Sequence, residues 1–87
     1  MKKIEKKTWP EYFDQVLKGK KNFEIRLADW GCKEGDVLVL REYDPKTKQY
    51  TGRVVEKVVT CVVKTKDFDC FPKEEVEKFG YQVIGIK

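Results

Sequence analysis

The first clear pattern along the chain is helical and lies near the N-terminus. Four apolar residues recur at intervals of three and four and predict one apolar face on a helix over residues 10–18: Trp9, Phe13, Val16 and Leu17. Pro10 suits the first turn, and Gly19 suits the left-handed conformation in which many helices end. Thr8 and Glu11 have the spacing of a capping box, so the Thr8 hydroxyl is expected to cap the helix.

After this helix the apolar period changes to two, which is the period of a strand. Phe23, Ile25 and Leu27 alternate with polar residues and predict a half-buried strand over residues 22–27. Large aromatic residues are usually buried in a domain of this size, so Trp9, Phe13 and Phe23 are expected in the core.

The remaining elements follow from apolar runs and from turn residues. Strands are predicted over residues 1–7, 36–43, 50–64 and 81–86, and a short helix over residues 72–79. The turn at residues 44–48 makes the two strands around it antiparallel. Valines occupy both faces of the segment 50–64, which predicts a bulge, a strong bend or burial on two sides.

This order of elements, β-α-β-β-β-α-β, indicates an α+β fold that is mostly β. We expect a small curved antiparallel β-barrel with two short helices, because a barrel protects strand edges that an open sheet leaves exposed. With 87 residues, 40% of them hydrophobic, the chain can build one small core. Residues 1–87 are therefore expected to form a single domain.

Composition indicates the cellular location of this domain and the charge of its partners. Charged residues make up 39% of the chain, and the net charge of +4 favours a polyanionic partner. Apolar runs are far shorter than the roughly 20 residues of a membrane-spanning helix, and the lysine-rich start does not resemble a secretory signal. The expected location is the cytoplasm, without a membrane.

Cysteine and histidine usage limits the chemistry. There is no His, and the three cysteines form no CxxC pair, so neither a metal nor another cofactor is expected. The spacing of Cys61 and Cys70 would allow a disulfide, but free thiols are the default in a reducing cytoplasm. Without His, a Ser-His or Cys-His hydrolase is excluded.

The segment from Gly19 to Arg26 is the most informative part of the sequence. Glu24 and Arg26 lie on one face of the predicted strand, and Lys21 lies at the turn before it. Arg26 could hold a phosphate or carboxylate in its planar fork while Glu24 accepts a hydrogen bond from an amino group. The alternative from periodicity alone is a surface ladder of ion pairs beside a helix end.

These eight residues fit the pattern G-x-K-x-x-E-x-R, and the chain thereby resembles the ASCH superfamily, relatives of the PUA RNA-binding domain. The resemblance extends to Trp9–Phe13, Gly35–Asp44 and Tyr50–Arg53, so it covers nearly the whole chain. It implies a single ASCH-like domain with a PUA-like barrel. A cleft between the first helix and the barrel would take RNA or a nucleotide-like ligand through Lys21, Glu24 and Arg26.

The same resemblance leaves a second activity open. One subgroup of small ASCH proteins is described as amidohydrolases of acylated cytidine that use a lysine, a threonine and a glutamate. Here Lys21 matches the lysine, but Glu24 stands where that subgroup has its threonine. The missing nucleophile favours binding over catalysis, with Lys21 and Glu24 as the catalytic candidates if the chain is an enzyme.

Four further residues are weighed as extensions of the site. Trp30 and Tyr43 could stack on a base, although Trp30 is as well suited to plug one end of a barrel. Arg41 and Arg53 could extend a basic rim, although both could equally pair with acidic neighbours across the strands. The predicted ligand-binding set is thus Lys21, Glu24, Arg26, Trp30, Arg41 and Arg53.

Overall fold

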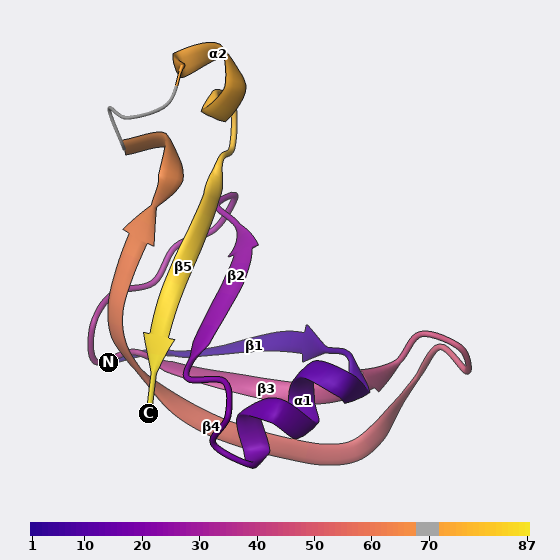
Figure 1. Cartoon of the computed structure of the whole chain (residues 1–87). Helices are drawn as coiled ribbons and strands as arrows, with labels where there is room; N and C mark the ends of the chain where they lie inside the picture. The colour runs from indigo at the N-terminus through magenta and orange to yellow at the C-terminus, as the bar shows by residue number, and fades with distance from the viewer. Residues whose placement is uncertain (68–71) are drawn as a thin grey trace.

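The computed structural model describes residues 1–67 and 72–87, apart from the side chains at positions 75 and 76 (Figure 1). Its strands are β1 (Lys3–Thr8), β2 (Phe23–Leu27), β3 (Val37–Asp44), β4 (Gln49–Lys64) and β5 (Tyr81–Ile86). Its helices are α1 (Pro10–Leu17), α2 (Lys73–Val76) and the short 3₁₀ helix η1 (Thr65–Asp67). The predicted order of elements is confirmed, with η1 added, and α2 is shorter than the sequence pattern indicated.

The strands form one five-stranded mixed sheet in the order β1-β3-β4-β5-β2. β1 runs parallel to β3, and the other pairs are antiparallel. The mostly β character is confirmed. A closed barrel is not: β1 and β2 stand at the two open edges of the sheet, and the parallel pair also departs from the predicted antiparallel arrangement. A parallel partner needs a crossover connection, which here is supplied by α1 and β2.

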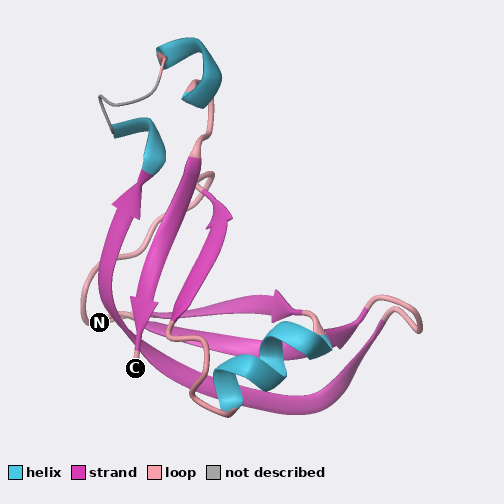
Figure 2. Cartoon of the chain, viewed as in Figure 1, coloured by secondary structure: helices cyan, strands magenta, loops and turns pink. Residues whose placement is uncertain are grey.

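The long strand β4 joins the two halves of the sheet. Its first half pairs with β3 and its second half with β5, and the register shifts between Val59 and Cys61. A bulge of this kind bends a strand and increases its twist. Figures 1 and 2 show the result: β1, β3 and the first half of β4 form one limb, and β5, β2 and the second half of β4 rise from it as a second limb.

The core fills the angle between the two limbs. Its buried apolar residues come from the helix and three strands: Phe13, Val16, Val37, Leu38, Leu40, Val59, Ile84 and Ile86. Helix α1 places Phe13 and Val16, three residues apart, against the sheet, as the helical period predicted. Leu17, which was predicted on the same face, is 48% exposed. Its end is also as predicted, because Gly19 has a φ of 76°.

Two of the expected core residues lie at the surface instead. Phe13 is 1% exposed, but Trp9 is 50% exposed and Phe23 is 42% exposed. The reason for Phe23 is the orientation of β2, which turns Glu24 inward and its odd-numbered apolar residues outward. Trp9 is the N-cap residue of α1 and turns its side chain outward, although Thr8 before it is buried.

Two other expectations concern the helix start and the thiols. Thr8 is the last residue of β1 and does not cap α1, whose N-cap residue Trp9 makes no side-chain hydrogen bond. Cys61 is exposed on β4, while Cys70, its suggested disulfide partner, lies outside the described residues. In the described part of the chain, no helix has the length and apolar character needed to cross a membrane.

Candidate functional site

A pocket of about 440 Å³ lies where the end of β1, the start of α1 and the edge strand β2 meet. Its lining residues are Lys7, Thr8, Trp9, Tyr12, Lys21, Glu24, Ile25 and Arg26. We refer to it as the motif pocket, because it contains the lysine, glutamate and arginine of the G-x-K-x-x-E-x-R pattern.

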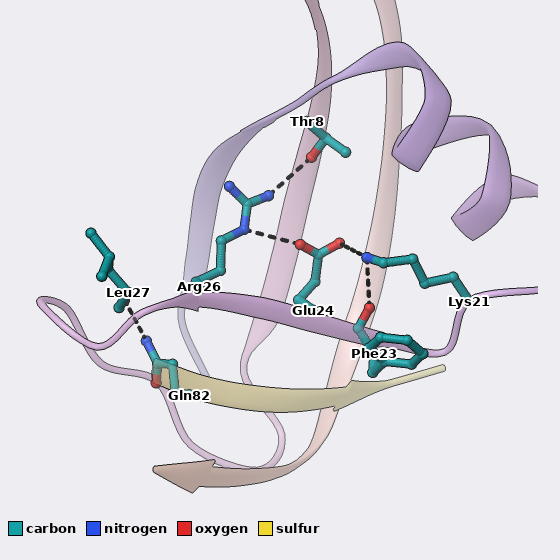
Figure 3. Close-up of polar contacts among 7 residues, drawn as sticks. All are labelled: Thr8, Lys21, Phe23, Glu24, Arg26, Leu27 and Gln82. Atoms are coloured by element: carbon teal, nitrogen blue, oxygen red, sulfur yellow. Dashed lines mark hydrogen bonds and ion pairs between the residues drawn. The ribbon is translucent and has the colours of Figure 1, made fainter. Parts of the chain in front are cut away.

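Glu24 is the buried centre of the motif pocket, with a side chain that is only 4% exposed. Arg26 Nε donates to Glu24 Oε2 at 3.0 Å, and Lys21 Nζ donates to Glu24 Oε1 at 3.3 Å (Figure 3). A buried carboxylate without partners is strongly destabilising, and two charge-assisted hydrogen bonds offset that cost. Glu24 thereby holds both cations in fixed positions at the pocket.

Lys21 is positioned by the end of the helix. Gly19 takes a positive φ, the chain reverses, and Lys21 then precedes β2 by two residues. Its ammonium also donates to the main-chain oxygen of Phe23 at 2.9 Å. The side chain is 15% exposed, so the cation is largely enclosed while it still borders the pocket.

Arg26 connects the motif to the other edge of the sheet. Its Nη2 donates to the Thr8 hydroxyl at 3.2 Å, and Thr8 is 3% exposed (Figure 3). A guanidinium carries five N–H donors, and the hydrogen bonds to Glu24 and Thr8 use two of them within the described chain. The remaining donors of this side chain, which is 22% exposed, can serve an anionic ligand.

Two aromatic rings border the same pocket. Trp9 is 50% exposed and Tyr12 is 48% exposed, and both lie at the start of α1. The Lys21 ammonium is 5.9 Å from the centre of the Tyr12 ring. The pocket thus combines flat apolar surfaces with cations, which is the combination that holds nucleobases and their phosphates.

The main chain of β2 contributes a third kind of contact. Ile86 N–H donates to Asn22 O and Ala28 N–H donates to Gly80 O, so the even-numbered residues of β2 bond to β5. The N–H and C=O of Ile25 therefore point to the open edge, where Lys21 already uses the oxygen of Phe23. Ile25 lines the motif pocket at this edge and offers it one donor and one acceptor.

Three predicted site residues do not line the motif pocket. Trp30 packs partly buried against the core, with Lys6 Nζ 3.8 Å from its ring centre. Arg41 Nη1 donates to Glu5 Oε1 at 3.3 Å, and its guanidinium carbon lies 4.0 Å from the centre of the Tyr50 ring.

Arg53 is engaged in the same way. Its Nε and Nη2 each donate to one oxygen of Glu42 at 2.9 Å, and Thr51 donates to Glu42 Oε1 at 2.6 Å. The Arg53 and Thr51 hydrogen bonds lower the pKa of Glu42 below its ordinary value of 4.5. Arg53 thus pairs with the acidic neighbour Glu42, as the alternative from strand pairing proposed.

Five residues of the motif pocket were not predicted from the sequence: Lys7, Thr8, Trp9, Tyr12 and Ile25. For two of them, the aromatic residues Trp9 and Tyr12, the sequence contained a pattern that could have predicted a shared surface. Trp9 and Tyr12 are three residues apart, a spacing that places both rings on one side of the helix start. Thr8 carried no such signal, because its contact with Arg26 joins residues 18 positions apart.

Residues 4–86 match the family described as "Domain of unknown function (DUF3850)". The chain belongs to this family. The DUF3850 match runs from β1 through β5 and so includes every element that builds the motif pocket.

This DUF3850 domain is also similar to a protein of Escherichia phage P2. The two are 42% identical over 64 residues, and the phage protein is named "Uncharacterized 12.9 kDa protein in GpA 3'region". The matched segment covers 74% of this chain and 57% of the phage protein. The DUF3850 domain therefore spans little more than half the length of that relative.

Proposed function

We propose that this DUF3850 domain is an ASCH-like binding module that takes single-stranded RNA or a nucleotide in the motif pocket. The observation that carries the proposal is the meeting, in one pocket, of half-exposed aromatic rings with cations arranged around a buried carboxylate. Neither feature alone is specific. Together they supply a stacking surface and an anion-binding group within the reach of one nucleotide.

The pocket has the size and lining of a small-ligand site. Its volume of about 440 Å³ falls within the roughly 300–1,000 Å³ of such sites. A base would stack on Trp9 or Tyr12, whose exposed rings are bordered by the cations. Stacking of this kind contributes about 1–3 kcal/mol per base and tolerates any sequence.

Charge around the pocket favours the phosphate of such a ligand. Lys7, Lys21 and Arg26 line it against the single carboxylate of Glu24, so the lining is net positive. The free N–H donors of Arg26 can bind two phosphate oxygens at once, which a lysine cannot do. Because Glu24 accepts from both Lys21 and Arg26, its role in this proposal is to position the two cations.

The main chain of Ile25 would read the edge of the base. The Watson–Crick edge of an unpaired base carries neighbouring donor and acceptor atoms, and an extended residue at a sheet edge presents the complementary pair. A base already paired in a duplex has no free Watson–Crick edge to offer. The geometry therefore supports a preference for single-stranded over double-stranded ligands.

The contacts in the pocket support binding more than hydrolysis of acylated cytidine. A lysine that acts as a general base must offer a free lone pair to the attacking group. Here Lys21 Nζ donates to both Phe23 O and Glu24 Oε1. The lining carries two hydroxyls, those of Thr8 and Tyr12. Thr8 accepts from Arg26, and among the described residues neither hydroxyl donates to a general base, so a nucleophile paired with a base is not assembled.

Titration of a short oligouridylate against the wild-type domain, followed by tryptophan fluorescence, tests the proposal. Affinity should fall as salt rises, with a logarithmic slope of about 0.7 per phosphate contacted on a single strand. Arg26→Ala should weaken binding and lower the slope by about 0.7, the share of one phosphate contact. A double-stranded oligonucleotide of the same length should bind more weakly than the single strand.

Arg41→Ala is the matched control, because it also removes one arginine charge, but at a site outside the pocket, where Arg41 contacts Glu5 and the Tyr50 ring. It should bind nearly as the wild type does. Equal affinities of wild type and Arg26→Ala, at both low and high salt, would remove Arg26 from the site and overturn the proposal.

A further inference from the structure

The side of the second limb that faces away from the core carries an unusual surface. Seven side chains from three adjacent strands form it, and we call it the outer face: Phe23, Ile25 and Leu27 of β2, Tyr81 and Val83 of β5, and Cys61 and Val63 of β4. The register places them in rows, because Ile25 lies opposite Val83 and Val83 opposite Val63. The outer face is thus continuous across the strands.

The outer face is both apolar and exposed. None of its seven residues is charged, although 39% of the chain is. Its largest members are 57% exposed at Ile25, 56% at Tyr81 and 50% at Leu27. With roughly 150–250 Å² for a fully exposed large side chain, the face presents on the order of 450 Å² of apolar surface. Apolar patches of this size on a monomer commonly mark an interaction site.

We propose that the outer face is the interface of a homodimer, with a second copy of this chain packed face to face against it. A stable dimer buries roughly 800 Å² on each copy, of which somewhat more than half is apolar. The outer face supplies about that apolar share, and the polar residues around it would supply the rim. Since the face has no charge, it offers nothing to an acidic partner that the net charge of +4 would attract.

The sizes of the side chains along β5 are compatible with a two-fold axis through the outer face. Along β5 the large Tyr81 stands at one end, Val83 in the middle and Gly85 at the other end. Gly85 has no side chain and lies between Phe23 of β2 and Cys61 of β4, with Cys61 Sγ 3.1 Å from where a Cβ would stand. An axis along the row through Val83, in the plane of the interface, brings Tyr81 of each copy over Gly85 of the other.

This arrangement is self-complementary, as a two-fold interface must be, because Tyr81 of each copy meets Gly85, a position without a side chain, on its partner. Of the residues that line the motif pocket, Ile25 alone belongs to the outer face; the others come from β1, the start of α1, the turn before β2 and the inward-facing side of β2. Dimerisation would therefore leave the pocket accessible. The proposal is independent of what that pocket binds.

Analytical ultracentrifugation of the wild-type chain over a series of concentrations tests the dimer. We expect the mass to rise from that of the 10.3 kDa monomer to twice that value with concentration. Leu27→Glu places a charge on the face and should raise the dissociation constant about tenfold or more. Val63→Lys, from another strand of the face, should do the same and guards against a folding defect in one variant.

Val54→Glu is the matched control, because Val54 is also an exposed apolar residue of β4, at 49%, but lies in the other limb. It should dimerise as the wild type does. Thermal melting of each variant alone would show whether the fold is kept. A wild type that stays monomeric at every concentration, or a folded Leu27→Glu that dimerises as well as Val54→Glu, would overturn the proposal.

Discussion

Thr8 and Arg26 join the two edges of the sheet. Thr8 ends β1, Arg26 lies on β2, and Arg26 Nη2 donates to the Thr8 hydroxyl at 3.2 Å. The two strands stand at opposite ends of the strand order and do not pair through their main chains. A side-chain contact therefore spans the gap that main-chain pairing would close in a barrel, and the motif pocket lies at that contact.

Thr8→Val should weaken the contact between the two edges while it keeps the shape of the side chain. A hydrogen bond to a charged group that is lost at a buried site costs about 1–3 kcal/mol, and the open pocket allows water to replace part of it. We expect a loss of about 1–2 kcal/mol in the free energy of unfolding, measured with urea.

Thr47→Val is the control for this substitution, because Thr47 is exposed in the turn between β3 and β4. It should change the free energy of unfolding by no more than about 0.5 kcal/mol. A Thr8→Val protein as stable as the control would mean that the edge-to-edge contact does not contribute to the fold.

Phe13 and Tyr12 are neighbours on α1 with different roles. Phe13 is 1% exposed, so Phe13→Ala should lower the free energy of unfolding by about 3–5 kcal/mol, enough to unfold much of a small domain. Tyr12 is 48% exposed beside the motif pocket, so Tyr12→Ala should keep the fold and weaken oligouridylate binding. Thermal melts and the fluorescence titration measure the two effects. Equal melting temperatures for the two variants would contradict the placement of Phe13.

The stability of the domain should fall in acid partly through Glu42. The hydrogen bonds from Arg53 and Thr51 lower its pKa in the folded state below the ordinary value of 4.5. Glu42 therefore stabilises the fold above that value, and this contribution is lost as the pH falls through the folded-state pKa. Asp36 acts in the same direction, because main-chain N–H groups of Lys33 and Lys2 lower its pKa.

Melting temperatures measured from neutral pH to about pH 3 would show this dependence. Glu42→Gln should be less stable than wild type at neutral pH, and the difference should shrink as the pH falls below 4.5. If the melting temperatures of wild type and Glu42→Gln differed by the same amount at every pH, the acid dependence would have to come from other groups.

The local elements could be predicted from the sequence because their signals are local. The helical spacing of Phe13 and Val16, the positive φ of Gly19 and the run from Tyr81 to Ile86 each depend on neighbours in the chain. The same reason allowed one site to be predicted for Lys21, Glu24 and Arg26. They lie within five positions of one another, and Glu24 and Arg26 are two residues apart on a strand, so they share a face.

Contacts between distant segments could not be predicted in this way. Alternation in β2 shows that one face is apolar, but not that Glu24 turns inward and Phe23 outward. That choice depends on Lys21 and Arg26, which neutralise Glu24, and on Thr8 in another strand. The parallel pairing of β1 with β3 likewise joins segments more than 30 positions apart.

Purified wild-type domain should show no detectable hydrolysis of N4-acetylcytidine. Lys21 Nζ already donates to two acceptors, and no paired nucleophile and base are assembled in the motif pocket. Chromatographic separation of acetylcytidine from cytidine is a direct assay. Turnover by the wild type that disappears in Lys21→Ala would replace the binding proposal with the amidohydrolase.

The proposed function requires that the pocket formed by α1 and the edge of β2 receives a nucleotide. Titration of the ¹⁵N-labelled domain with oligouridylate, followed by NMR, would locate the bound ligand. The Ile25 amide and the Trp9 indole N–H should shift together and saturably, while amides of the β3–β4 turn stay in place, and Arg26→Ala should need far more ligand. Saturable shifts that leave Ile25 and Trp9 unchanged, or no shifts at millimolar ligand, would contradict the proposed function.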